Sequence, residues 1–214
     1  MSIPDMQDRY FLMPMLDGWT NLFQVPGKRT TGTKAQTYAI TGPGWKGILP
    51  ADVQELKAPT NLVWILGRIY CTGTPEDYKA VHEAQDAFKL VPLSAYGKSY
   101  PPPPGPVDPA IDMKTAVREQ VNKLDANAYC TLLCQLMKTN PPAAADAPEL
   151  ARFARIGIVP GKDFEASKLR ADFATRVPEV GFDRIMLQFK INRAVKHDNS
   201  WNFTPKTGIY GTTI

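Results

Sequence analysis

The chain has 214 residues, of which 43% are hydrophobic and 21% charged. This is an ordinary balance for a globular protein with one large core or two small ones. The net charge of +4 is scattered along the chain, and no run of Lys and Arg alternates with aromatic residues as in a nucleic-acid groove. We therefore expect no nucleic-acid partner.

No apolar stretch reaches the roughly 18–20 residues that cross a bilayer. The N-terminal MSIPDMQDRY lacks the basic and apolar regions of a signal peptide. We expect no membrane span, and a cytoplasmic chain unless a leader precedes it.

Residues 1–100 are predicted to form a β-rich domain with one helix. YFLMPML (10–16) is almost continuously apolar, as in a strand covered on both faces, and Pro14 indicates an edge or a bulge. TYAIT (37–41) and NLVWILGRIY (61–70) are predicted strands because they are rich in β-branched and aromatic residues.

The helix of this domain is predicted in TPEDYKAVHEAQDAFKL (74–90). Thr74 is a suitable N-cap, Pro75 fits the first helical position, and Asp77 lies where a capping-box acid belongs.

Prolines dominate YPPPPGPVDP (100–109), which predicts an extended linker over residues 101–112. Residues 113–198 are predicted to form a helical connector. Its helices are expected at 125–140, at 146–157 with Gly157 at the end, and in GFDRIMLQFKINRAVK near the end of the connector. Residues 199–214 turn β-like and are interpreted as the start of a truncated second β domain.

The helix at 125–140 is predicted to turn one apolar side inward, and that side consists of Tyr129, Leu132, Leu133, Leu136 and Met137. Overall the chain is predicted to be α+β, with an antiparallel β-sandwich-like N-terminal half and a helical C-terminal half.

The chain has three cysteines, an odd number that argues against a disulfide framework. Cys130 and Cys134 lie four residues apart on a predicted helix and are interpreted as core thiols. A metal pair would need further Cys or His ligands, and the chain has only two histidines, so no metal site and no cofactor are predicted.

GPGWKG (42–47) matches the glycine pattern of a dinucleotide-binding turn. That turn requires a helix whose first amides bind the pyrophosphate. Here Pro50 and Pro59 follow before any helical period, so we interpret the glycines as part of a turn between strands.

Arg68 shares a face with Trp64 in the strand at 61–70. If that face is covered, Arg68 needs an anionic partner, for which Asp17 is the candidate. The alternative is that Arg68 points into a pocket and binds a carboxylate or phosphate.

Other polar and aromatic residues near the predicted strand ends could line a small-molecule pocket or could simply cap turns. The candidate binding residues are Arg68, Asp17, Trp19, Thr20, Asn21, Arg29, Trp45 and Tyr96. No catalytic residue is assigned, because the chain has no G-x-S-x-G, H-E-x-x-H, P-loop or C-x-x-C motif.

Five blocks in the order RYFLMPMLDGWTNLF, GKRTTGT, ITGPGWKGILP, APTNLVWILGRIY and AQDAFKLVPLSAYGK resemble bacterial domain-of-unknown-function family 1254 over about residues 5–105. NSWNFTPKTGIYGT resembles the opening of the companion family 1214. The resemblance implies a β-sandwich-like domain, a helical connector and a second β-rich domain, in a bacterial protein whose relatives often carry an export signal. A periplasmic or envelope location follows if such a leader is missing here.

Two functions remain open for the chain itself, and a third possibility is that it is merely a folding unit whose function belongs to a longer protein. The first is a non-catalytic binding or structural module that associates with itself or a partner protein through exposed sheet edges. The alternative is an enzyme, a hydrolase or oxidoreductase, acting on a small apolar or acidic molecule in a pocket lined by Trp19, Trp45, Trp64 and Tyr96, with Arg68 binding an acidic group.

Overall fold

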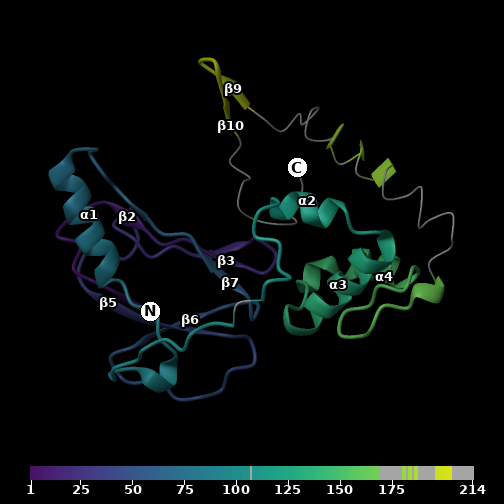
Figure 1. Cartoon of the computed structure of the whole chain (residues 1–214), viewed down its shortest axis with the longest axis horizontal. Coiled ribbons are helices and arrows are strands. Elements are labelled where there is room, and N and C mark those ends of the chain that lie inside the picture. Colours follow the sequence, from purple (N-terminus) through teal and green to yellow (C-terminus); the bar gives the residue numbers. More distant parts are fainter. Residues whose placement is uncertain (107, 169–179, 182, 185, 188–195, 204–214) are drawn as a thin grey trace. The chain divides into compact units, whose positions relative to one another are not determined.

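The computed structural model describes residues 1–106 and 108–168, and also 180–181, 183–184, 186–187 and 196–203. The chain divides into two compact units, Met1–Pro106 and Val107–Ile214. The first unit contains small, mostly antiparallel sheets and the second contains most of the helices, so the predicted α+β class is confirmed (Figure 1).

Two long predicted strands in the first unit are each broken into two. The stretch 10–16 forms β2 (Phe11–Leu12) and β3 (Met15–Asp17), and the stretch 61–70 forms β7 (Val63–Ile65) and β8 (Arg68–Ile69). β2 pairs with β8 and β3 with β7, both antiparallel, so the two breaks face each other across one ladder. Pro14 has no N–H to donate, which is consistent with a break at this point.

β3 also pairs with β4 (Leu22–Gln24), giving a sheet in the order β4-β3-β7 with a bulge between β3 and β4. A separate sheet has the order β1-β5-β6 and contains β1 (Ser2–Ile3), β5 (Gln36–Thr41) and β6 (Gln54–Lys57).

β5 and β6 are parallel, the one departure from the predicted antiparallel arrangement among the described strands. Parallel neighbours need a crossover of about a dozen residues, and GPGWKG begins this crossover. The Trp45 amide bonds to the Gly42 carbonyl at 3.1 Å, and no helix lies between the two strands. The interpretation of the motif as a turn is confirmed.

Side chains from both sheets meet in one core, which supports the sandwich-like description. The buried residues of this core are Ile3, Met6, Phe11, Met15, Tyr38 and Leu56. Helix α1 (Pro75–Ala87) covers this core through Ala84, and Phe88 at its C-cap meets Phe11 edge-to-face at 6.3 Å. Thr74 caps the helix as predicted, accepting the Asp77 amide at 3.3 Å.

In the second unit, α3 (Ala126–Thr139) begins at the Asp125 N-cap, close to the predicted start. The predicted inward face is wrong for Tyr129, Leu132 and Leu136, which are 48%, 41% and 50% exposed, but it is confirmed for Met137, which is buried. The buried residues are Cys130, Cys134 and Met137, which lie at i, i+4 and i+7 of the helix. The two cysteines are core thiols, as the sequence predicted, and burial raises the pKa of Cys130.

The other helices of this unit are α2 (Val117–Asn122) and α4 (Ala147–Ala154). Gly157 follows α4 with φ +88°, so the predicted stop is confirmed. The helix predicted in GFDRIMLQFKINRAVK lies largely outside the described residues.

β9 (Lys196–Asp198) and β10 (Trp201–Phe203) form an antiparallel hairpin. The predicted β character of the tail from residue 199 is confirmed for β10, whereas β9 lies in the stretch predicted as helical connector, so that prediction is wrong for Lys196–Asp198.

Among the described residues, no helix combines the length and the apolar character needed to cross a membrane.

Candidate functional site

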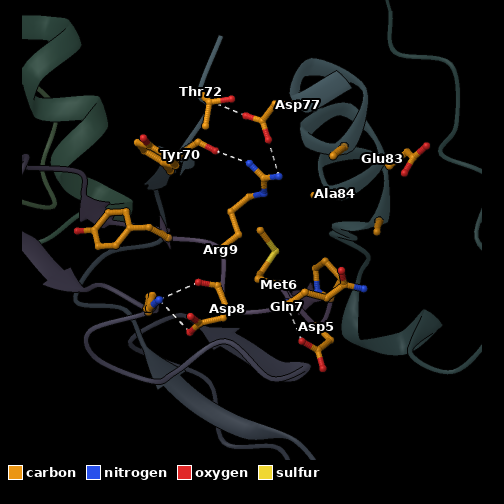
Figure 2. Close-up of a pocket in the computed structure, with 15 residues that line it drawn as sticks. Asp5, Met6, Gln7, Asp8, Arg9, Tyr70, Thr72, Asp77, Glu83 and Ala84 are labelled. Carbon is orange, nitrogen blue, oxygen red and sulfur yellow. Dashed lines mark hydrogen bonds and ion pairs between the residues drawn. The ribbon is translucent and has the colours of Figure 1, made fainter. Parts of the chain in front are cut away.

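A cleft of about 720 Å³ lies between α1 and the N-terminal segment of the first unit (Figure 2). One wall is the helix face that carries Ala80, Ala84 and Ala87, whose small side chains leave the space open. The opposite wall is the stretch from Pro4 to Tyr10. Lys28, Tyr70, Thr72, Asp77 and Glu83 complete the lining.

Arg9 lies at the centre of a polar network in this cleft. Its Nη2 contacts Asp77 Oδ1 at 2.7 Å, and its Nη1 donates to the Tyr70 carbonyl at 3.0 Å. The second carboxylate oxygen of Asp77 accepts the Thr72 amide at 2.6 Å. The ion pair is partly shielded from water, with the side chains of Arg9 and Asp77 only 23% and 14% exposed. Figure 2 shows the guanidinium reaching from the N-terminal segment to the start of α1.

The local sequence explains why Asp77 is available for this network. Asp77 occupies the third position of α1, where a capping-box acid would reach back to the Thr74 amide. In the structure it instead bonds to Arg9 and to Thr72, just before the cap. The hydrogen bond from Arg9, followed by that from the Thr72 amide, holds the pKa of Asp77 well below its ordinary value. The same contact raises the pKa of Arg9.

The N-terminal wall of the cleft contains a tight turn in an uncommon conformation. Gln7 and Asp8 have φ of 48° and 66°, and the Arg9 amide closes the turn on the Met6 carbonyl at 2.8 Å. Residues other than glycine rarely adopt this left-handed conformation. Here Asp5 Oδ1 accepts the Gln7 amide at 2.9 Å, and Lys28 Nζ contacts both the carbonyl and the carboxylate of Asp8 at 2.8 Å.

The predicted pairing of Arg68 with Asp17 is wrong. Arg68 is exposed on β8, and none of the described residues forms an ion pair with it. Asp17 is buried, and Oδ1 accepts the amides of Trp19 and Asn21 at 2.8 and 2.9 Å, while Oδ2 accepts the Asn21 side chain at 3.2 Å. A loop that folds back on its own aspartate satisfies the buried charge without any arginine.

The structure places the other candidate residues at separate points of the first unit. Thr20 lies in the loop of Asp17, exposed and with φ of 66°. The Arg29 guanidinium lies 5.8 Å from the centre of the Tyr10 ring. Trp45 packs over Gly47, and the Tyr96 hydroxyl donates to Asp52 at 2.6 Å, which raises the pKa of Tyr96.

None of the eight candidate residues lines the cleft, although the loop at Asp17 brings Trp19, Thr20 and Asn21 together. Their role in binding stays a prediction.

Sequence reasoning missed Arg9 as a site residue. The sequence marks Asp77 only as a capping residue, and the two residues are separated by 68 positions. The sequence did contain one weak signal. Thr74 already caps the start of α1, so the acidic side chain in the first turn of this helix can bind a cation instead. Nothing in the sequence says which of the many basic residues would supply it.

The chemistry available in the cleft is limited by these contacts. Arg9, Thr72 and the Cys71 thiol all lower the pKa of the Asp77 carboxylate. A general base works best with a pKa near neutrality, whereas that of Asp77 is lowered. Among the residues that the structure describes, no three His, Cys, Asp or Glu side chains are grouped to share a metal ion.

The first unit is thus a small layered α+β domain whose helix is tied to its N-terminal segment by a shielded ion pair. Residues 1–92 match the family model described as a protein of unknown function, DUF1254. This supports the resemblance to family 1254, while the resemblance of the tail to family 1214 stays a prediction.

No curated protein matches the chain. Among solved structures, it is similar to the crystal structure of the VPA0106 protein from Vibrio parahaemolyticus, with 27% identity and a TM-score of 0.63. The alignment covers 90% of this chain and 46% of that protein, so the chain spans less than half of its length.

Proposed function

We propose that the unit Met1–Pro106 is a non-catalytic binding or structural module. The observation that carries the proposal is the closed network of Arg9, Asp77 and the backbone at Tyr70 and Thr72. Arg9 and Asp77 satisfy each other's charge, and a carboxylate held well below its ordinary pKa is a poor proton acceptor. Such a network is suited to holding α1 against the N-terminal segment.

The division into a β-rich domain, a linker at 101–112, a connector and a second β domain belongs to the same proposal. So does association through exposed sheet edges.

The proposal is tested by a turnover screen of the whole chain. Chromogenic esters, phosphates and glycosides are offered as hydrolase substrates, and NADPH with a panel of aldehydes as oxidoreductase substrates. We expect the native and heat-denatured chains to give the same background rate. Turnover that disappears on denaturation would refute the proposal in favour of the enzyme alternative. Its loss in Arg9→Gln but not in Tyr96→Phe would then assign the activity to the cleft.

A further inference from the structure

The outer edge of β7 is open in the described part of the chain. The sheet runs in the order β4-β3-β7, so β7 pairs with β3 on one side only. Next to β7, the Leu66 amide donates to the Pro14 carbonyl at 3.0 Å. The Asp17 amide of β3 donates to the Asn21 carbonyl instead, on the side of β3 that faces away from β7. Since hydrogen-bonded pairs alternate along an antiparallel ladder, Trp64 bonds toward β3, and the backbone groups of Val63 and Ile65 face outward.

β7 is short, with three residues, but its edge carries no charge, proline or bulge. Natural edges are usually blocked by charged residues, proline or bulges. β6, the edge of the other three-stranded sheet, carries Glu55 and Lys57. By contrast, NLVWILG (61–67) has no charge and no proline and is rich in β-forming residues.

The exposed face of the same sheet carries an apolar row beside the exposed Gln24 of β4. Leu16 lies directly opposite Leu22 on β4 and opposite Trp64 on β7, so the three side chains form one cross-strand row. Leu22 is 41% exposed and Trp64 is 55% exposed, whereas Met15 and Asp17 on the other side of β3 are buried. An apolar row that ends at an unprotected edge is a surface suited to a further strand.

We propose that β7 pairs with β7 of a second copy of this chain. The inference rests on the proposed function, since it identifies the partner of the binding module. A twofold axis at Trp64 places Val63 of each copy opposite Ile65 of the other, and these are the residues whose backbone groups face outward. The two Trp64 residues then form the closely spaced, non-hydrogen-bonded pair at the centre. The resulting interface is isologous and closes at the dimer.

Self-pairing also places no like charges opposite each other within this strand, because residues 61–67 are uncharged. The two apolar rows become one continuous row across a six-stranded sheet. The edge is short, so it buries less than a standard interface of about 1,600 Å² and gives a weak, reversible dimer.

Sedimentation velocity of the whole chain over about 5–200 µM tests the pairing, since weak association shows in this range. We expect the native chain to shift from monomer to dimer as the concentration rises. Trp64→Lys and Trp64→Glu each place two like charges at the axis, so either variant alone stays monomeric. An equimolar mixture of the two brings opposite charges together and recovers the dimer.

Ile48→Lys is the matched control, because Ile48 is 96% exposed and lies outside every strand. It leaves the dimer unchanged. Circular dichroism establishes that each variant is folded, which is expected because more than half of the Trp64 side chain already faces water.

A native chain that stays monomeric throughout would overturn the proposal. So would a dimer that persists in Trp64→Lys, one that Ile48→Lys also abolishes, or assembly beyond the dimer. None of these results bears on turnover. A chain that is monomeric and inactive would therefore refute the self-pairing proposal and leave the non-catalytic proposal standing. A chain that is dimeric and shows enzymatic turnover would refute the non-catalytic proposal and leave the self-pairing proposal standing.

Discussion

Truncating Phe11 to alanine tests whether the core described above holds the first unit together. Phe11 is fully buried among Ile3, Met6 and Met15, and its ring meets Phe88 edge-to-face. Removing a buried phenylalanine side chain costs about 3–5 kcal/mol, from the lost transfer free energy and the cavity that remains. A domain is typically stable by only about 5–15 kcal/mol, so Phe11→Ala should lose a large part of the free energy of unfolding.

Phe11→Leu separates the contribution of ring contact from that of volume. Leucine fills most of the space but cannot reproduce the aromatic contact with Phe88. We therefore expect a cost of about 1 kcal/mol, within the range of near-isosteric exchanges. Tyr78→Ala is the control, because Tyr78 is 51% exposed on α1 and should change stability by less than about 0.5 kcal/mol.

Urea unfolding followed by circular dichroism measures these differences. The midpoint should fall in the order Tyr78→Ala, Phe11→Leu, Phe11→Ala, with an unchanged dependence on urea. A loss below about 1 kcal/mol for Phe11→Ala would contradict the central position of this ring, because no fully buried phenylalanine in a packed core is that inexpensive to remove.

Two further predictions concern the cleft and the approach of two backbone segments. Asp77→Asn should be less stable than the native chain at neutral pH. The lowered pKa of Asp77 means that its contact with Arg9 stabilises the fold above the ordinary carboxyl pKa of 3.8 and is lost as the pH falls. Thermal unfolding from pH 7 to about pH 2 should thus show the two melting temperatures converging below about pH 4; a constant gap would mean that the carboxylate charge is not what holds α1. Gly27→Ala should cost about 1–3 kcal/mol, because a Cβ would lie 2.6 Å from the Phe11 carbonyl oxygen. Gly44→Ala, with nothing within 4 Å of its Cβ, is the control in the same melting experiment, and equal melting temperatures for the two alanine variants would refute the close approach.

Local signals predicted the individual elements well. The Thr74 cap and Pro75 place the start of α1, Asp125 starts α3, and the left-handed Gly157 follows α4. Caps and glycine stops act through hydrogen bonds and backbone conformations that span only a few residues, so the sequence contains all the information they need. The absence of a helix after GPGWKG was predictable for the same reason.

The face of α3 was not predictable from its own residues. Apolar side chains surround much of this helix, and the periodicity allows more than one buried stripe. Cys130 and Cys134, which lie outside the predicted stripe, are buried, whereas Tyr129, Leu132 and Leu136 are exposed. A helix cannot select its buried side without the segments that pack against it.

By itself, the sequence determined the α+β class, the position of most helices and strands, and the turn at residues 42–47. These depend on hydrophobic period, caps and prolines, which act over short distances. Only the tertiary structure decided that Asp17 is satisfied by its own loop, that Arg9 rather than Arg68 holds a shielded carboxylate, and that β7 lies at the edge of its sheet among the described strands. Each of these depends on which distant segments meet, and that is settled by the packing of the whole unit and not by any local pattern.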